Sequence, residues 1–200
     1  MLMRPYGFSL IELLITMALS LTLFTGVIAL TSQLLSSQRL MSAELALKTE
    51  LSLIAEILTN EIRRAGFNEH AVELFLAKAP SPFTPSVTLF ASGDKKEANC
   101  ILFSYDKNRN GIVDIDAPDE RFGFKLHKNA IEIRRDGRTC EQGGWHDLTD
   151  PRTVSVTAFS LTEYFSPNGH HYIHILIGAH HVRFAQLANE KNIFIKIENG

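Results

Sequence analysis

The feature that most constrains this chain is a long run without charged side chains close to its start. Residues 13–38 contain no Asp, Glu, Lys or Arg. A helix that crosses a bilayer needs about 20 mainly apolar residues, whereas the apolar core of an ordinary secretory signal has only about 7–15. Residues 8–30 satisfy the longer requirement. We therefore expect them to form a transmembrane helix.

The few residues before this run predict its orientation. Residues 1–7, MLMRPYG, carry one positive charge, on Arg4, and no acid. By the positive-inside rule this end stays in the cytoplasm and the rest of the chain is exported. No small-residue cleavage site of the A-x-A type follows the apolar run, so any cleavage is expected before it. Pro5 and Gly7 both disfavour a helix that continues backwards, and Gly7 marks the expected break.

One acid, Glu12, lies early in the apolar run. A carboxylate carried to the centre of a bilayer costs about 2.5–3.5 kcal/mol. A partner that compensates this charge is therefore expected, and that partner bears on function.

The stretch GFSLIELLITMALSL resembles the class III signal of type IV pilins and type II secretion pseudopilins. The resemblance implies that a membrane prepilin peptidase cuts between Gly7 and Phe8 and methylates the new terminal amine. Phe8 and Glu12 are four positions apart and share one helix face, so Glu12 can neutralise that amine. The resemblance further implies that Glu12 pairs with the terminal amine of a neighbouring subunit in a filament. The alternative is a plain single-span anchor.

Beyond the span the pattern becomes amphipathic. Apolar residues recur at helical spacing, at Leu40, Leu47, Leu51, Ile54, Leu58 and Ile62. No proline interrupts residues 6–79, so one helix is expected from Phe8 to about Ala65, ending at Gly66. Residues 31–66 then form its amphipathic half, and residues 67–200 form a globular, β-rich periplasmic domain.

Residues 67–97 contain Pro80, Pro82 and Pro85 and are interpreted as loop. After them the apolar period shortens towards two, which predicts strands. The predicted strands are residues 100–105, 122–127, 131–135, 154–159, 173–177 and 193–197. A long helix followed by an antiparallel sheet is an α+β arrangement, and it is also the type IV pilin fold that the resemblance implies.

Four later segments, NEIRRAGF, YDKNRNG, ERFGFKLHKNAIEIRRDGRTCEQGGW and LTDP, resemble the PilW/PulJ-like minor pilins, including the prepilin peptidase-dependent protein B group. This resemblance implies an inner-membrane subunit that initiates or caps assembly of a type IV pilus. Its implied partners are the prepilin peptidase, other minor and major pilins or pseudopilins, and the inner-membrane assembly platform. The alternatives are a minor pseudopilin of a type II secretion system and a subunit of a competence or DNA-uptake pilus.

The two cysteines, Cys100 and Cys140, both lie in the part of the chain expected to be exported. An even pair in an oxidising compartment favours a disulfide. Two buried free thiols are the alternative.

The stretch DKNRNGIVDID has the spacing of a calcium-binding loop. Oxygen-bearing side chains occupy alternate places and the ninth, and Gly111 permits a sharp turn. The predicted ligands are Asp106, Asn108, Asn110 and Asp114. The twelfth place holds Ala117 instead of a bidentate glutamate, so Asp116, Asp119 or Glu120 would have to substitute. The alternatives are a polar turn between strands and, as a different class of function, a membrane-anchored calcium-binding module.

Other functions find little support in the sequence. The formal net charge is −2, and without a basic excess direct contact with nucleic acid is not expected. The chain has no G-x-S-x-G elbow, no H-E-x-x-H and no P-loop. We therefore expect a structural protein that is not an enzyme and requires no cofactor, with calcium as the one candidate ligand.

Overall fold

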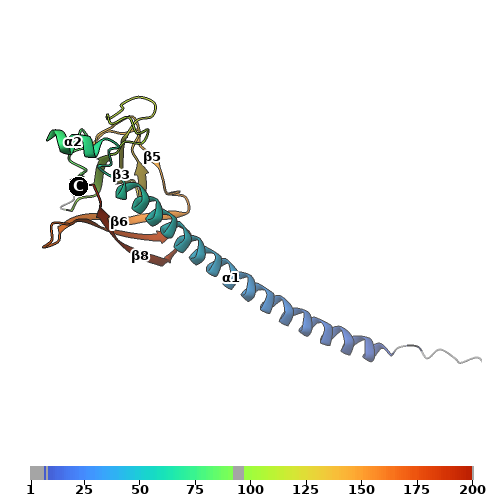
Figure 1. Cartoon of the computed structure of the whole chain (residues 1–200). Helices are drawn as coiled ribbons and strands as arrows, with labels where there is room; N and C mark the ends of the chain where they lie inside the picture. Colours follow the sequence, from blue (N-terminus) through green and yellow to red (C-terminus); the bar gives the residue numbers. More distant parts are fainter. Residues whose placement is uncertain (1–6, 8, 92–96, 200) are drawn as a thin grey trace, which may run out of the picture. The chain divides into compact units, whose positions relative to one another are not determined.

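The computed structural model describes Gly7 and residues 9–91 and 97–199. The chain divides into two compact units, with the boundary between Ser42 and Ala43. Figure 1 shows the elements in chain order, which are α1 (Leu10–Arg63), α2 (Ala71–Ala77), β1 (Val87–Phe90), β2 (Cys100–Ser104), β3 (Arg121–His127), β4 (Ala130–Ile133), β5 (His146–Asp147), β6 (Val154–Phe165), β7 (His171–His181) and β8 (Phe184–Ile197).

The predicted long helix is confirmed as α1, which is 54 residues long. It ends where Gly66 adopts a left-handed conformation with φ of +77°. The Gly66 N–H donates to the carbonyl oxygen of Ser104 at 2.9 Å. A Cβ at this position would lie 2.5 Å from the carbonyl oxygen of Asn199. Only glycine fits this turn, which directs the chain from the helix into the sheets.

The second unit contains two antiparallel sheets, one of five strands in the order β1-β2-β3-β4-β5 and one of three in the order β6-β7-β8. Strands β3 and β4, which correspond to the predicted strands 122–127 and 131–135, pair antiparallel as a hairpin. Its two turn residues, Lys128 and Asn129, have φ of 47° and 62°, as a type I′ turn requires.

The two sheets are joined by backbone hydrogen bonds. The N–H of Leu161 in β6 donates to the carbonyl oxygen of Ala98 at 2.8 Å, and the N–H of Val156 donates to that of Asn129 at 2.8 Å. The inner faces of both sheets therefore contribute to one core.

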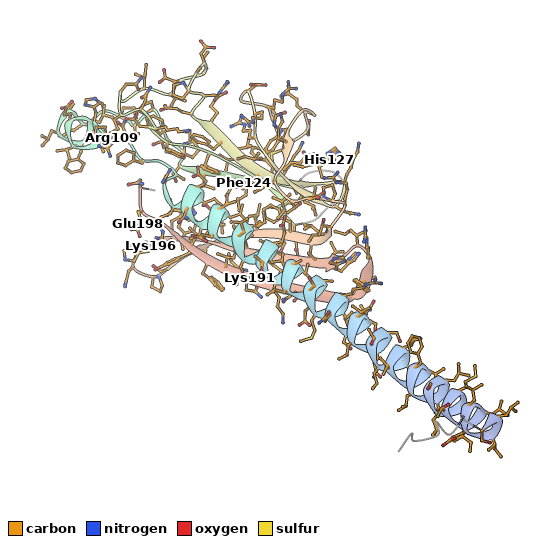
Figure 2. All side chains as sticks on the ribbon, turned by 90° about the vertical axis from the view of Figure 1, so that its right-hand side faces the viewer. Arg109, Phe124, His127, Lys191, Lys196 and Glu198 are labelled. Atoms are coloured by element: carbon orange, nitrogen blue, oxygen red, sulfur yellow. A yellow bond between two sulfur atoms is a disulfide. The ribbon has the colours of Figure 1, made fainter. Side chains whose placement is uncertain are left out.

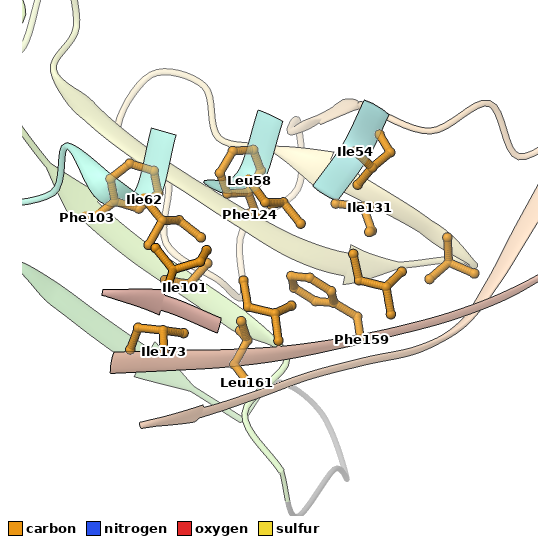
Figure 3. Packing of buried hydrophobic residues seen from close by; sticks show 14 of the residues in the cluster. Ile54, Leu58, Ile62, Ile101, Phe103, Phe124, Ile131, Phe159, Leu161 and Ile173 are labelled. Atoms are coloured by element: carbon orange, nitrogen blue, oxygen red, sulfur yellow. The ribbon is translucent and has the colours of Figure 1, made fainter. Parts of the chain in front are cut away.

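The core forms where the second half of α1 meets both sheets (Figure 3). Leu47, Leu51, Ile54, Leu58 and Ile62 are each at most 2% exposed. They pack with residues of the first sheet and of the second, among them Ile101, Phe103, Phe124, Ile131, Phe159, Leu161 and Ile173. The predicted α+β arrangement and the predicted helical stripe are thus confirmed, except that Leu40 is 38% exposed and lies before the packed segment.

The structure differs from the sequence interpretation in two places. The strands predicted at 154–159, 173–177 and 193–197 are longer in the structure, where β6, β7 and β8 pair along most of their lengths. Residues 67–97 contain α2 and β1 as well as loop. Helix α2 has only seven residues, none of them buried, and a helix this short is not stable by itself in water. The Glu69 N–H, just before it, donates to Asp106 Oδ2 at 3.1 Å. Strand β1 likewise depends on its pairing with β2. Both elements depend on contacts far away in the sequence.

Candidate membrane-anchoring and assembly site

The predicted processing site lies directly before α1. Gly7 is exposed and outside any helix or strand, and apart from its chain neighbours no described residue has an atom within 4 Å of a Cβ built on it. Phe8 and leader residues 1–6 lie outside the described residues. Cleavage between Gly7 and Phe8 therefore stays a prediction.

Glu12 contributes to the N-terminal cap of α1. The helix begins at Leu10, so Ser9 occupies the N-cap position and Glu12 the third helical position. The Ser9 N–H donates to Glu12 Oε2 at 3.4 Å, and the Ser9 carbonyl oxygen accepts the N–H groups of Glu12 and Leu13 at 3.0 and 3.2 Å. This is the glutamate half of a capping box, and it places the carboxylate at the positive end of the helix dipole.

The sequence interpretation missed this cap, although the spacing Ser-x-x-Glu signals it. Glu12 thus has a local role in the first turn of α1 without any partner molecule. Within the stretches that the structure describes, Glu12 forms no ion pair.

The first unit has an apolar surface on all sides. An 18-residue window of α1 has a mean hydropathy of 2.3, and none of that window is buried. Figure 2 shows side chains radiating from this part of the helix in every direction. A helix that is apolar all round suits a lipid environment. Over the described residues, α1 is the one helix long and apolar enough to cross a membrane.

The hydroxyl groups in this segment bond within the helix. Thr16 donates to the carbonyl oxygen of Leu13 at 2.9 Å, Ser20 to that of Thr16 at 2.6 Å, and Thr31 to that of Val27 at 2.8 Å. Hydroxyls that bond to their own helix carry little penalty in a membrane, where water is absent.

Cys100 and Cys140 are joined by a disulfide. The bond connects the start of β2 to the loop after β4, and both cysteines are buried. Beside it the Lys125 Nζ donates to the carbonyl oxygens of Cys140 and Gln142 at 3.2 and 2.9 Å. The same nitrogen lies 4.6 Å from the ring centre of Trp145, and burial lowers the pKa of Lys125. The disulfide, the lysine and the tryptophan thus form one cluster on the face of the first sheet opposite the main core.

The four predicted calcium ligands come together in one loop. The side-chain amides of Asn108 and Asn110 donate to Asp114 Oδ2 at 2.6 and 2.8 Å. The N–H groups of Asn110 and Gly111 donate to the two carboxylate oxygens of Asp106, each at 3.0 Å. The sequence placed these side chains in proximity, and the structure shows them in contact.

Glu120 also belongs to this loop. It is fully buried and accepts the N–H groups of Lys107, Asn108 and Asp114 at 2.6, 3.1 and 3.3 Å. Across the described residues, no group of three or more His, Cys, Asp or Glu is arranged to hold a metal ion. A calcium site here would therefore depend on the asparagine oxygens as well, and oxygen donors of these kinds are what Ca²⁺ binds.

Comparisons with known proteins agree with these features. Residues 2–28 match the prokaryotic N-terminal methylation motif. Residues 40–197 match the family of prepilin peptidase-dependent protein B. The chain is 28% identical over 160 residues to prepilin peptidase-dependent protein B of Escherichia coli (strain K12), which covers 79% of this chain and 78% of that protein. No solved structure matches the chain significantly.

The long apolar helix packed on antiparallel sheets is a type IV pilin fold. The matched family is structural, and this chain is accordingly not an enzyme. Because the family model covers most of the chain and the methylation motif covers its start, the chain belongs to the prepilin peptidase-dependent protein B family of type IV pilin-like proteins.

Proposed function

We propose that this protein is a minor pilin that initiates or caps assembly of a type IV pilus. The observation that carries the proposal is the position of Glu12, at the first turn of an exposed apolar helix with its carboxylate on the Ser9 N–H. Ser9 is the residue after Phe8, where the mature chain would begin. The Glu12 carboxylate thus contacts the N–H group of the residue that follows the expected terminal amine in the sequence.

The proposed organisation follows from this position. Residues 1–7 are a leader that is removed, and residues 8–30 cross the inner membrane once with the N-terminus in the cytoplasm. Residues 31–66 form the amphipathic half of the helix, and residues 67–200 lie in the periplasm. The prepilin peptidase, other pilins and the inner-membrane assembly platform are the proposed partners.

Glu12 acts first within its own chain in this account. Cleavage exposes a positive amine at Phe8, and Glu12 neutralises it while the subunit waits in the membrane. On assembly the amine of a neighbouring subunit takes over as partner. A desolvated ion pair of this kind contributes little net stability, but it can specify the register between two apolar helices.

A strain that lacks the native protein and carries the full-length Glu12→Ala variant tests this role. We expect the variant to be membrane-inserted and cleaved like the wild type, while the number of surface pili counted by electron microscopy falls to the level of the deletion strain. Glu44→Ala is the matched control, because Glu44 is a half-buried acid on the same helix and its one ion pair among the described residues is with Lys48, at 2.6 Å. Wild-type piliation in the Glu12→Ala strain would refute the proposed role.

The two related alternatives are distinguished in the same strains. A type II secretion pseudopilin would leave piliation intact and abolish secretion, and a competence pilus subunit would abolish DNA uptake instead. The absence of a basic excess in the sequence gives no support to direct contact with DNA.

A second proposal is that the loop around Asp106 binds calcium. The supporting observation is that Asp106 and Glu120 are 2% and 0% exposed. Over the described part of the chain, neither pairs with a lysine, arginine or histidine. Each of the two carboxylates accepts three backbone N–H groups, which compensates part of the cost of burying it. Ca²⁺ would neutralise the remaining negative charge.

Calorimetric titration of the full-length protein in neutral detergent tests the calcium proposal. We expect binding with a dissociation constant in the range of extracellular calcium modules, about 10⁻⁴–10⁻³ M, and its loss in Glu120→Gln. Asp116→Asn, which alters an exposed acid of the same loop, is the control that should still bind. No binding by the wild type at ~10 mM calcium, ten times the upper limit of that range, would exclude the site.

A further inference from the structure

A small pocket lies on the first sheet, on the face opposite the main core. Its volume is about 200 Å³, and its lining includes Arg121, Arg134, Thr88, Ser104 and Leu102. Arg121 and Ser104 are paired neighbours on β3 and β2, and Arg134 follows β4. The pocket borders the Asp106 loop, because the Nη2 group of Arg121 donates to the carbonyl oxygen of Ile115 in that loop at 3.2 Å.

Arg134 is held in place without a carboxylate partner. Its Nε donates to the carbonyl oxygen of Arg138 at 2.6 Å, its Nη2 to that of Gly137 at 2.8 Å, and its Nη1 to that of Phe122 at 3.4 Å. Within the described residues, no acid forms an ion pair with it. The guanidinium is therefore rigid, and its charge is not neutralised by a direct contact.

Only part of the Arg121 guanidinium group is bonded to a carboxylate. Its Nε and Nη2 form a two-pronged contact with the carboxylate of Asp119, at 3.0 and 2.9 Å. The Nη1 group has no partner among the described residues. Gly137 makes room for this side chain, because any Cβ there would collide with the Arg121 guanidinium.

Arg121 and Arg134 lie close enough for their charges to interact. Asp119 contacts Arg121 directly, and Asp116 and Asp136 also act on its charge without direct contact. Burial lowers the pKa of Arg134, and the charge of Arg121 lowers it further. The hydroxyl groups of Thr88 and Ser104, which also line the pocket, form no side-chain hydrogen bond with any described residue. The hydroxyl groups on β1 and β2 and the Nη1 group of Arg121 on β3, which donate to no described residue, therefore line this pocket.

We propose that this pocket binds a small oxyanion, a carboxylate or phosphate group, between Arg121 and Arg134. The Nε–Nη2 edges of both guanidinium groups are already occupied, by Asp119 and by the carbonyl oxygens of Arg138 and Gly137. The oxyanion would therefore accept from the Nη1 group of Arg121 and from the remaining N–H donors at the end of the Arg134 guanidinium. Thr88 and Ser104 would donate to the remaining oxygens. The pocket is large enough for such a group and a few attached atoms, and the inference does not depend on the role in pilus assembly.

The test is a titration of the full-length protein in neutral detergent, followed by NMR of the arginine Nε–H signals. Sodium phosphate and sodium acetate are added separately, with chloride keeping the ionic strength constant. We expect at least one of them to shift the Arg134 signal saturably. The comparison of the two ions shows which oxyanion is preferred. A further arm with phosphatidylglycerol vesicles shows whether a lipid headgroup binds better than the free ion.

Arg134→Gln should weaken binding at least tenfold. Arg135→Gln is the matched control, because Arg135 is its exposed neighbour, and it should bind like the wild type. Thr88→Val covers the case in which loss of Arg134 unfolds the loop, and it should weaken binding several-fold in a folded protein. The inference is overturned if no titration saturates, or if Arg135→Gln weakens binding as much as Arg134→Gln does.

Discussion

The disulfide between Cys100 and Cys140 makes a quantitative prediction possible. The two cysteines are 40 positions apart in the sequence. Closing a loop of that length removes about 13 cal/mol/K of entropy from the unfolded chain, which corresponds to about 4 kcal/mol at 25 °C. We therefore expect replacement of both cysteines by alanine to lower the free energy of unfolding by about this amount.

Contacts beside the disulfide indicate that its removal should lower the free energy of unfolding by the full entropic amount. Lys125 is buried and donates to the carbonyl oxygens of Cys140 and Gln142, both in the loop that the disulfide anchors. If that loop detaches, the charge of Lys125 loses two acceptors. Glu132, whose Oε2 lies 3.7 Å from the Lys125 Nζ, would remain as a partner. Loss of buried acceptors costs about 1–3 kcal/mol, so detachment of the loop adds to the entropic loss.

The assay is urea unfolding of the full-length protein in neutral detergent, followed by the fluorescence of Trp145. This is the only tryptophan in the chain, and it packs in the same cluster as the disulfide. Wild-type protein treated with a reductant should unfold like the double alanine variant, which controls for the substitutions themselves. A loss below ~1 kcal/mol, half the lower end of the usual range for a native disulfide, would refute the reasoning.

Two further predictions concern the core and the end of α1. Leu58→Ala removes a side chain that is 0% exposed and should cost about 2–5 kcal/mol in urea unfolding; Leu53→Ala, on the exposed side of the helix, should change stability by no more than about 0.5 kcal/mol, and equal losses would contradict the packing. Burial, followed by the hydrogen bond to Glu61, raises the pKa of Tyr105 to about 12. Since the pKa is raised on folding, this contribution to stability is complete below pH 10 and is lost as the pH rises towards 12. The wild type should therefore lose more stability than Tyr105→Phe over this interval, and parallel curves would count against the account.

The parts of the fold that follow local rules could be predicted from the sequence. The stripe from Leu47 to Ile62 has helical spacing, and a repeating apolar period needs no knowledge of its partner. The turn at Lys128–Asn129 is another local feature. Helix α2 and strand β1 could not be predicted, because they depend on Asp106 and on β2, which lie far along the chain.

The candidate sites divide in the same way. The cap at Glu12 could be predicted from the Ser-x-x-Glu spacing of Ser9 and Glu12. The sequence interpretation assigned Glu12 only to the terminal amine and missed the cap. The sequence named Glu120 only as one of three possible replacements for the ligand at the twelfth place, beside Asp116 and Asp119. Spacing could not choose among them, because Glu120 closes a longer loop through contacts with Lys107, Asn108 and Asp114. In the sequence Arg134 stands only beside Arg135, with nothing to link it to a site. The hydrogen bonding of strands β2, β3 and β4 brings it to the same pocket as Arg121 and Ser104.

The central claim is that the prepilin machinery processes this chain and thereby creates the charged partner of Glu12. Intact-mass measurement and N-terminal sequencing of the protein, produced with and without its cognate prepilin peptidase, test this claim most directly. The account predicts a mature chain that begins at Phe8 and carries a methyl group on its amine, formed only when the peptidase is present. A chain that keeps Met1 under both conditions, or one cut beyond residue 30, would contradict it.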